Sequence, residues 1–280
     1  MNTLQAEYQV ETLAQVLEVS PSGYYAHQHK SQRPRARQDQ ALRPEIQSVF
    51  QASRRTYGSP RIQRALRQQG HRCGKNRIAR LMREHHLRAR QKRRFVPRTT
   101  QSDHNQPIAP NWLAQVPTPV RPDQVWVVDI TYIATGEGWV YLAVILDACS
   151  RKVVGWAMSV SLETSLVTAA LNRAQTERRP APGLLHHSDR GVQYASSAYR
   201  ALLACYQITP SMSRAANPYD NAMAESFMAT LKTECFDYTP ATRAQARLMV
   251  FDYLETFYNP KRLHSALGYK SPVEFENQFN

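Results

Sequence analysis

Three apolar runs in the middle of the chain constrain its fold more than any other feature. They span residues Val125 to Ile133, Trp139 to Leu146 and Val153 to Met158, and the short stretches ATGEG and DACSRK separate them. Runs rich in β-branched and aromatic residues, bounded by turn-forming residues, are typical of strands. We therefore expect an antiparallel three-stranded meander. Because the first run lacks polar alternation, it indicates a strand covered on both faces.

The chain after this meander alternates between helical and strand patterns. The patterns predict a helix in ETSLVTAALNRAQTERR, a strand in GLLHHSD, a helix in SSAYRALLACY and a strand in QITPSM. A last helix is expected in NPYDNAMAESFMATLKTECF, with Asn217 as its N-cap and Pro218 at its first position. This order predicts a mixed α/β sheet with helices on its faces.

One carboxylate, Asp129, interrupts the first apolar run. A buried charge is unfavourable without a partner. Asp189 ends the fourth predicted strand, and Glu225 is expected two turns into the last helix. Carboxylates that share a space repel one another unless a cation compensates them, and Mg²⁺ prefers oxygen ligands. Taken singly, Asp189 also fits a turn residue and Glu225 a solvated helical position, and we interpret Asp147 as a turn residue.

A cation on the same helix extends this hypothesis. Lys232 follows Glu225 by seven residues, so both side chains are expected on one helical face about 10 Å apart. Lys232 could hold the DNA strand that carboxylate-bound metal ions would cut. A surface Glu and Lys on one face is the ordinary alternative.

The charge distribution points to a polyanionic partner. Residues 1–105 contain 21 Lys and Arg against 7 Asp and Glu, whereas residues 106–280 contain 15 of each type. The whole net charge of +14 therefore comes from the first third of the chain. A one-sided basic block favours nucleic acid over a membrane surface.

Two helical pairs are predicted within this basic third. In the first, Leu13, Val16 and Leu17 share a helical face, and Ser20 and Pro21 begin the next helix. The second pair lies between residues 61 and 87, where Gly70 and Gly74 interrupt the helical pattern. The apolar positions of the second pair are Ile62, Leu66, Ile78, Leu81 and Met82.

The last of these helices carries a basic face that could read DNA. Arg77, Arg80 and Arg83 project away from its apolar side, as in a recognition helix that contacts a major groove and its phosphates. An ordinary solvated basic face is the alternative. Lys92, Arg93 and Arg94 follow directly and favour the DNA-binding hypothesis.

Composition also suggests the domain boundaries and the cellular location of the protein. We expect a helix-turn-helix-like segment over residues 1–40, a basic DNA-binding region over 41–95 and a Pro-rich linker over 96–122. The mixed α/β core would span 123–240 and a C-terminal helical extension 241–280. No apolar run is long enough to span a membrane, and the four scattered cysteines suggest neither disulfides nor zinc. We expect a cytoplasmic, nucleoid-associated protein.

Several stretches together resemble one known family. DQVWVVDITYI, GWVYLAVILDACSRKVVGWAMS, LLHHSDRGVQYAS, NPYDNAMAESFMATLKTE and YNPKRLHSALGYKSPVEFE occur in this order. They are similar to the OrfB-type transposases of the IS-three group of bacterial insertion sequences, which are relatives of retroviral integrases with an RNase H-like catalytic fold. The similarity covers about residues 10 to 278.

The resemblance implies specific roles. The family has a D, D, E metal triad with 35 residues between the last two acids, and the same number separates Asp189 from Glu225. Asp129, Asp189 and Glu225 would then ligate two Mg²⁺ ions, with Mn²⁺ as a substitute, and Lys232 would contact the transposon end. YGSPRI and the basic region after it match the family's helix-turn-helix segment. A C-terminal signature of unassigned role contains Tyr258, Asn259, Arg262, His264 and Ser271.

The implied function is DNA transposition: binding of the element's ends, metal-dependent strand cleavage and transfer of the freed 3′-hydroxyl. A homo-oligomer on double-stranded DNA is expected, because two ends must be held together. The upstream-frame protein of such elements is a further expected partner, since its helix-turn-helix and leucine-zipper portion is not obvious here. Two alternatives are a metal-dependent nuclease without strand transfer and a non-catalytic DNA-binding regulator.

Overall fold

The computed structural model describes residues 3–4, 6–28, 34–91, 106–214 and 217–279. The chain forms two compact units, Met1–Ala89 and Arg90–Asn280. No helix in the described ranges is both long and apolar enough to cross a membrane. The predicted region boundaries are not tested by this division and stay predictions.

The first unit is entirely helical. Its helices are α1 (Val10–Val16), α2 (Pro21–Gln28), α3 (Pro34–Ala52), α4 (Ser59–Gln68) and α5 (Lys75–Glu84). Both predicted helical pairs are present, and the apolar positions predicted in α4 and α5 are all buried. Ser20 begins α2 as expected, because its Oγ accepts a hydrogen bond of 3.0 Å from the Gly23 N–H.

Two features of this unit differ from the sequence-based expectation. The buried stripe of α1 is Val10, Leu13 and Ala14, so Val16 and Leu17 are exposed. The stripe follows i, i+3, i+4 spacing from Val10 rather than from Leu13. Helix α3 was not predicted, since its apolar residues are diluted by Arg and Gln; they are Leu42, Ile46, Val49 and Phe50.

The second unit is built around a five-stranded sheet with the order β3-β2-β1-β4-β5. The strands are β1 (Val125–Thr135), β2 (Gly138–Asp147), β3 (Val153–Ser159), β4 (Leu185–Ser188) and β5 (Thr209–Met212). β1, β2 and β3 pair antiparallel, which confirms the predicted meander, whereas β4 pairs parallel to both β1 and β5. This mixed sheet is RNase H-like.

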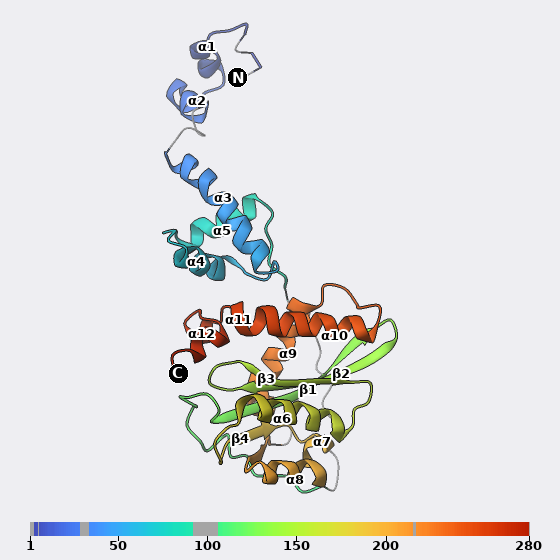
Figure 1. The fold of residues 1–280 in the computed structure, drawn as a ribbon. Helices are drawn as coiled ribbons and strands as arrows, with labels where there is room; N and C mark the ends of the chain where they lie inside the picture. The colour runs from blue at the N-terminus through green and yellow to red at the C-terminus, as the bar shows by residue number, and fades with distance from the viewer. Residues whose placement is uncertain (1–2, 5, 29–33, 92–105, 215–216, 280) are drawn as a thin grey trace. The chain divides into compact units, whose positions relative to one another are not determined.

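Helices cover both faces of the sheet (Figure 1). One face carries α6 (Thr164–Arg178), α7 (Val192–Ala195) and α8 (Ser197–Cys205), and the other carries α9 (Ala222–Cys235) and α10 (Arg243–Phe251). After α10 the chain continues as a π-helix (Asp252–Tyr258), α11 (Asn259–Lys261), a short 3₁₀ turn (Ser265–Leu267) and α12 (Pro272–Glu276). Of these, α7 was not predicted separately.

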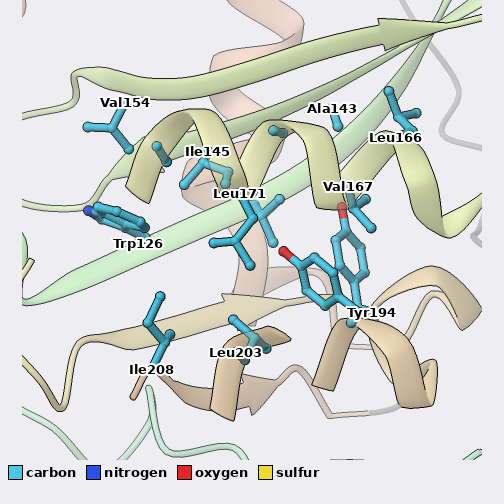
Figure 2. Close-up of a cluster of buried hydrophobic side chains, with 14 of the residues drawn as sticks. Trp126, Ala143, Ile145, Val154, Leu166, Val167, Leu171, Tyr194, Leu203 and Ile208 are labelled. Carbon is cyan, nitrogen blue, oxygen red and sulfur yellow. The ribbon is translucent and has the colours of Figure 1, made fainter. Parts of the chain in front are cut away.

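The main core lies between the sheet and α6 to α8. Trp126 of β1, Ile145 of β2 and Leu171 of α6 are all fully buried in it. Figure 2 shows these side chains together with Tyr194, Leu203 and further residues of the cluster. Because large apolar side chains from strands and helices interlock there, the core fixes the strands that carry the candidate site.

The first strand is covered on both faces for only part of its length. Val125 to Val128 are all buried, whereas Tyr132 is exposed and Ile133 is buried. The expectation of a strand covered along its whole length was therefore wrong from Asp129 onward, where the burial starts to alternate. Asp129 itself is half-buried, at the point where the cover ends.

Gly155 of β3 permits the close packing of α6 on the sheet. A Cβ atom built at this position would lie 2.4 Å from the Ala170 carbonyl oxygen and 2.7 Å from the Ala174 Cβ. Gly155→Ala should therefore lower the free energy of unfolding by about 1–3 kcal/mol through overpacking. Chemical denaturation measures this loss, and an unchanged midpoint would show that α6 moves away at no cost.

The residues of the C-terminal signature make intramolecular contacts. Asn259 accepts a hydrogen bond from the Val153 N–H (2.9 Å) and donates one to its carbonyl (3.0 Å), so it covers the open edge of β3. Ser271 begins α12 with a capping box. The Tyr258 ring packs edge-on against His264. Arg262 forms a buried ion pair with Glu234 of α9. These contacts dock the extension on the sheet unit.

The described end of the predicted linker also packs on this unit. The Pro110 carbonyl accepts a hydrogen bond from the Met212 N–H (3.4 Å), and the Leu113 N–H donates to the Ser211 Oγ (3.2 Å). The Asn111 amide donates to Asp220 at 2.8 Å. Part of the segment 106–122 therefore packs along β5. The rest of the predicted linker, residues 96–105, lies outside the described ranges.

Candidate active site

Two of the predicted carboxylates lie on neighbouring strands, Asp129 within β1 and Asp189 directly after β4. β1 and β4 are parallel neighbours, and Val127 pairs with His187. Asp129 and Asp189 each lie two residues beyond this pair. Since the two strands run parallel in this register, equal offsets from the pair bring the two carboxylates side by side from positions 60 residues apart. Asp189 is half-buried and accepts a hydrogen bond of 2.9 Å from the Gly191 N–H.

The helix that carries Glu225 begins later than predicted. Residues Pro218–Asn221 form a 3₁₀ turn, and α9 starts at Ala222 with Asn221 as its N-cap. The predicted N-cap at Asn217 is therefore wrong, because Asp and Asn residues favour tight turns over helix interiors. Glu225 lies in the first turn of α9 rather than two turns in. The partial positive charge at a helix start favours a carboxylate there.

The three carboxylates influence one another electrostatically. Desolvation, followed by the charges of Asp189 and Glu225, raises the pKa of Asp129 to about 8. The Ile130 N–H, at 2.8 Å, and the charge of Lys232 act in the opposite direction. Desolvation and Asp189 also raise the pKa of Glu225, which is exposed. A cation placed among these groups would relieve the repulsion.

The chemistry of this group fits a hard divalent cation, although its present geometry is open. Within the described ranges, no three His, Cys, Asp or Glu side chains converge closely enough to hold one ion. The donors of Asp129, Asp189 and Glu225 are all oxygen, which is the ligand type that Mg²⁺ prefers.

Lys232 belongs to the same neighbourhood. It lies on α9 with Glu225, and seven residues bring both side chains to nearly the same face of that continuous helix. Lys232 is half-buried, and desolvation lowers its pKa while the charge of Asp129 raises it. Lys232 therefore lies within electrostatic range of Asp129, and its predicted contact with DNA stays a prediction.

The predicted basic face of α5 is partly engaged within the first unit. Asp39 of α3 accepts hydrogen bonds from Arg77 Nε at 2.6 Å and from Arg80 Nη2 at 2.5 Å. Both arginines therefore pair with α3, while Arg83 is exposed. The sequence carried no signal for these pairs, because 38 and 41 residues separate the partners. Lys92, Arg93 and Arg94 lie outside the described residues.

Asp220 is a site-adjacent residue that the sequence patterns did not single out. Its carboxylate accepts hydrogen bonds from Arg214 at 2.9 and 3.0 Å and from Asn111 at 2.8 Å. The hydrogen bond from Arg214 lowers the pKa of Asp220 below its usual value. Asp220 therefore ties together the chain segments that lead into α9.

The raised pKa of Asp129 predicts how the metal-free protein responds to pH. Between the ordinary value of 3.8 and about 8, the folded state keeps a proton that the unfolded state has released. Stability must therefore fall as pH rises through this window. Thermal unfolding in the presence of a chelator should show this fall, and Asp129→Asn should remove that part of it. Equal slopes for both proteins would contradict the cause assigned here.

Comparison with protein families places the chain. Integrase core domain models match residues 119–218 and 206–272, and an HTH-like domain model matches residues 37–95. An uncharacterized 31 kDa protein of insertion element IS600 from Shigella sonnei is 43% identical over 269 residues, covering 96% of this chain and 98% of that protein. Transposase InsF of IS3A from Escherichia coli K12 is 38% identical, covering 98% and 96%. The chain belongs to the IS3 family of transposases. It is accordingly a DDE polynucleotidyl transferase.

The transposase is also similar, at lower sequence identity, to chains of solved structures. A chain of the simian T-cell lymphotropic virus intasome in complex with PP2A regulatory subunit B56 gamma is 17% identical, with a TM-score of 0.49, covering 76% of this chain and 70% of that chain. The HTLV-2 integrase catalytic core domain in complex with magnesium is 15% identical, with a TM-score of 0.40, covering 56% and 97%.

Proposed function

We propose that this transposase binds the ends of its insertion sequence, hydrolyses a phosphodiester there and joins the freed 3′-hydroxyl to a phosphodiester of target DNA, whose own 3′-oxygen leaves. Asp129, Asp189 and Glu225 would hold two Mg²⁺ ions, which Mn²⁺ can replace. The observation that carries this proposal is the electrostatic coupling of three carboxylates: desolvation, followed by the charges of Asp189 and Glu225, raises the pKa of Asp129 to about 8. Membership of the IS3 family supports it.

Each proposed site residue has a role that follows from its position in the fold and its charge. Asp129 is fixed by a central strand and Asp189 by its neighbour, while Glu225 is carried by α9. When bound, divalent ions activate the attacking oxygen and stabilise the leaving oxygen of an in-line displacement. Lys232 would hold a backbone phosphate beside these carboxylates.

DNA binding by the first unit would depend on its exposed cations. Arg83 is free of the Asp39 network, and Lys92, Arg93 and Arg94 extend the basic stretch. Arg77 and Arg80 would contribute while paired to Asp39. The excess of basic residues in this part of the chain should make affinity for end DNA fall steeply with salt.

The proposal also covers the oligomeric state, the partner protein and the cellular location. Two element ends must be synapsed, which requires at least two copies of the chain. The upstream-frame protein of the element is a second proposed partner. Activity on chromosomal DNA would place the protein in the cytoplasm, at the nucleoid.

A strand-transfer assay tests this function. Labelled end DNA is incubated with the protein, Mg²⁺ and a longer unlabelled target. A transposase gives cleaved ends and then joined products of greater length. Cleaved ends that never join, in Mg²⁺ or in Mn²⁺, would identify a nuclease. Binding without cleavage would identify a DNA-binding regulator.

A further inference from the structure

Asn221 is a buried polar residue that has no role in the proposed mechanism. It is only 4% exposed and occupies the N-cap of α9. An N-cap Asn ordinarily accepts a hydrogen bond from an amide in the first turn of its own helix. Asn221 makes no such bond. Its Nδ2 instead donates 3.2 Å across to the Val128 carbonyl of β1, 93 residues earlier in the chain.

The other end of the same amide is left without compensation. Asn221 Oδ1 is buried and has no hydrogen-bond partner among the described residues. An unpaired buried acceptor is destabilising. The structure therefore keeps an unfavourable arrangement at this position, and such exceptions call for a specific explanation.

The hydrogen bond joins two of the elements that carry the candidate site, β1 and α9. Val128 directly precedes Asp129, and Asn221 precedes Glu225 by four residues, about one helical turn. α9 also packs on β1 through its apolar side, and this hydrogen bond is the polar contact that fixes the start of α9 against the backbone next to Asp129. A displacement of about 1 Å between reacting groups can lower a rate on the order of a hundredfold.

We propose that Asn221 is a positioning residue, which sets the location of Glu225 relative to Asp129 by holding the start of α9 on β1. The inference rests on the proposed function of these two carboxylates. Asn221 itself need not touch the substrate or a metal ion. Its loss should displace the carboxylate more than it weakens the fold, because the helix receives no capping bond from it.

The chain provides a matched control of the same residue type. Asn259 is also buried, at 6% exposure, and its side-chain amide also bonds strand backbone. It contacts Val153 at the edge strand β3, which β2 separates from β1. Asn259→Ala removes two hydrogen bonds to strand backbone, whereas Asn221→Ala removes one.

The experiment compares Asn221→Ala, Asn259→Ala and wild type in the full chain. Thermal unfolding, end-DNA affinity, cleavage rate and the Mg²⁺ concentration for half-maximal cleavage are measured for each. Hydrogen exchange of residues 226–231 of α9 adds a readout that needs no cleavage. For Asn221→Ala we expect unchanged affinity, about a hundredfold slower cleavage, a higher Mg²⁺ requirement and about tenfold faster exchange in α9. For Asn259→Ala we expect the larger loss of thermal stability and a wild-type Mg²⁺ requirement.

Two outcomes would overturn the inference. One is exchange in α9 that is unchanged by Asn221→Ala. The other is a loss of cleavage in both variants that merely follows the loss of folded protein, with the same Mg²⁺ requirement. A wild-type protein that never cleaves end DNA would refute the proposed function instead, and the exchange measurement would still decide whether Asn221 holds α9.

Discussion

An Asp129→Asn variant should bind end DNA as tightly as the wild type and cleave it about a thousandfold more slowly. The amide keeps the size of the carboxyl group but loses the negative charge that would hold a divalent ion. A metal ion typically stabilises the transition state by several kcal/mol, and each loss of about 1.4 kcal/mol slows the reaction tenfold. Losing this stabilisation therefore corresponds to roughly a thousandfold slower cleavage. Affinity should persist because the cationic excess lies in the first third of the chain. Gel-shift and single-turnover cleavage assays measure the two properties.

Asp147 offers the matched control for this variant. It is also an aspartate of a strand, the last residue of β2, and it is fully buried. Its oxygens accept hydrogen bonds from the Ser150 N–H at 2.7 Å and the Asp123 N–H at 2.7 Å, as expected of a turn residue. Asp147→Asn should lower thermal stability while cleavage per folded molecule is retained. Cleavage by Asp129→Asn at the wild-type rate would exclude Asp129 as a metal ligand.

A Glu234→Gln variant should lose about 3–5 kcal/mol of folding stability, because it leaves a charged guanidinium buried without its partner. Arg262 donates to both oxygens of Glu234 at 2.7 Å, and the Tyr253 hydroxyl adds a third hydrogen bond at 2.8 Å. The side chains of Arg262 and Glu234 are only 5% and 8% exposed. Chemical denaturation of the isolated variant measures the loss.

Glu177→Gln is the matched control for the buried pair. Glu177 also pairs with an arginine, Arg173, at 3.1 Å, but its side chain is 52% exposed. Removing this carboxylate should change stability by less than about 0.5 kcal/mol, since water screens exposed pairs. Similar losses in the two variants would mean that the Arg262–Glu234 pair contributes no more than a surface ion pair.

The long, strongly patterned elements were predictable because their signals are local. The three apolar runs became β1, β2 and β3, and the stripes Ile62, Leu66 and Ile78, Leu81, Met82 became the buried faces of α4 and α5. Each pattern repeats within one element, so neighbouring residues suffice to recognise it. The start of α9 was predicted wrongly because no repeating pattern distinguishes a 3₁₀ turn from an α-helix over the four residues Pro218–Asn221.

The ion pairs were not predictable for a related reason. Asp39 with Arg77 and Arg80, and Glu234 with Arg262, join residues 28 to 41 positions apart. No periodicity connects such residues, and each one alone has the sequence character of an ordinary surface charge. The same holds for the amide of Asn221, whose partner is a backbone carbonyl and leaves no mark on the sequence.

The sequence by itself determined that the chain has a basic helical part and an α/β part, and it singled out Asp129 as a charge in an apolar strand. The predicted elements already grouped this residue with Asp189 and Glu225, and the family resemblance assigned the three to a metal triad. Only the tertiary structure decided that β4 lies parallel beside β1, that cover over β1 ends at Asp129, and that Asn221 ties α9 to that strand. Strand order and side-chain contacts of this kind depend on how distant segments pack together, which local patterns of charge and hydrophobicity do not specify.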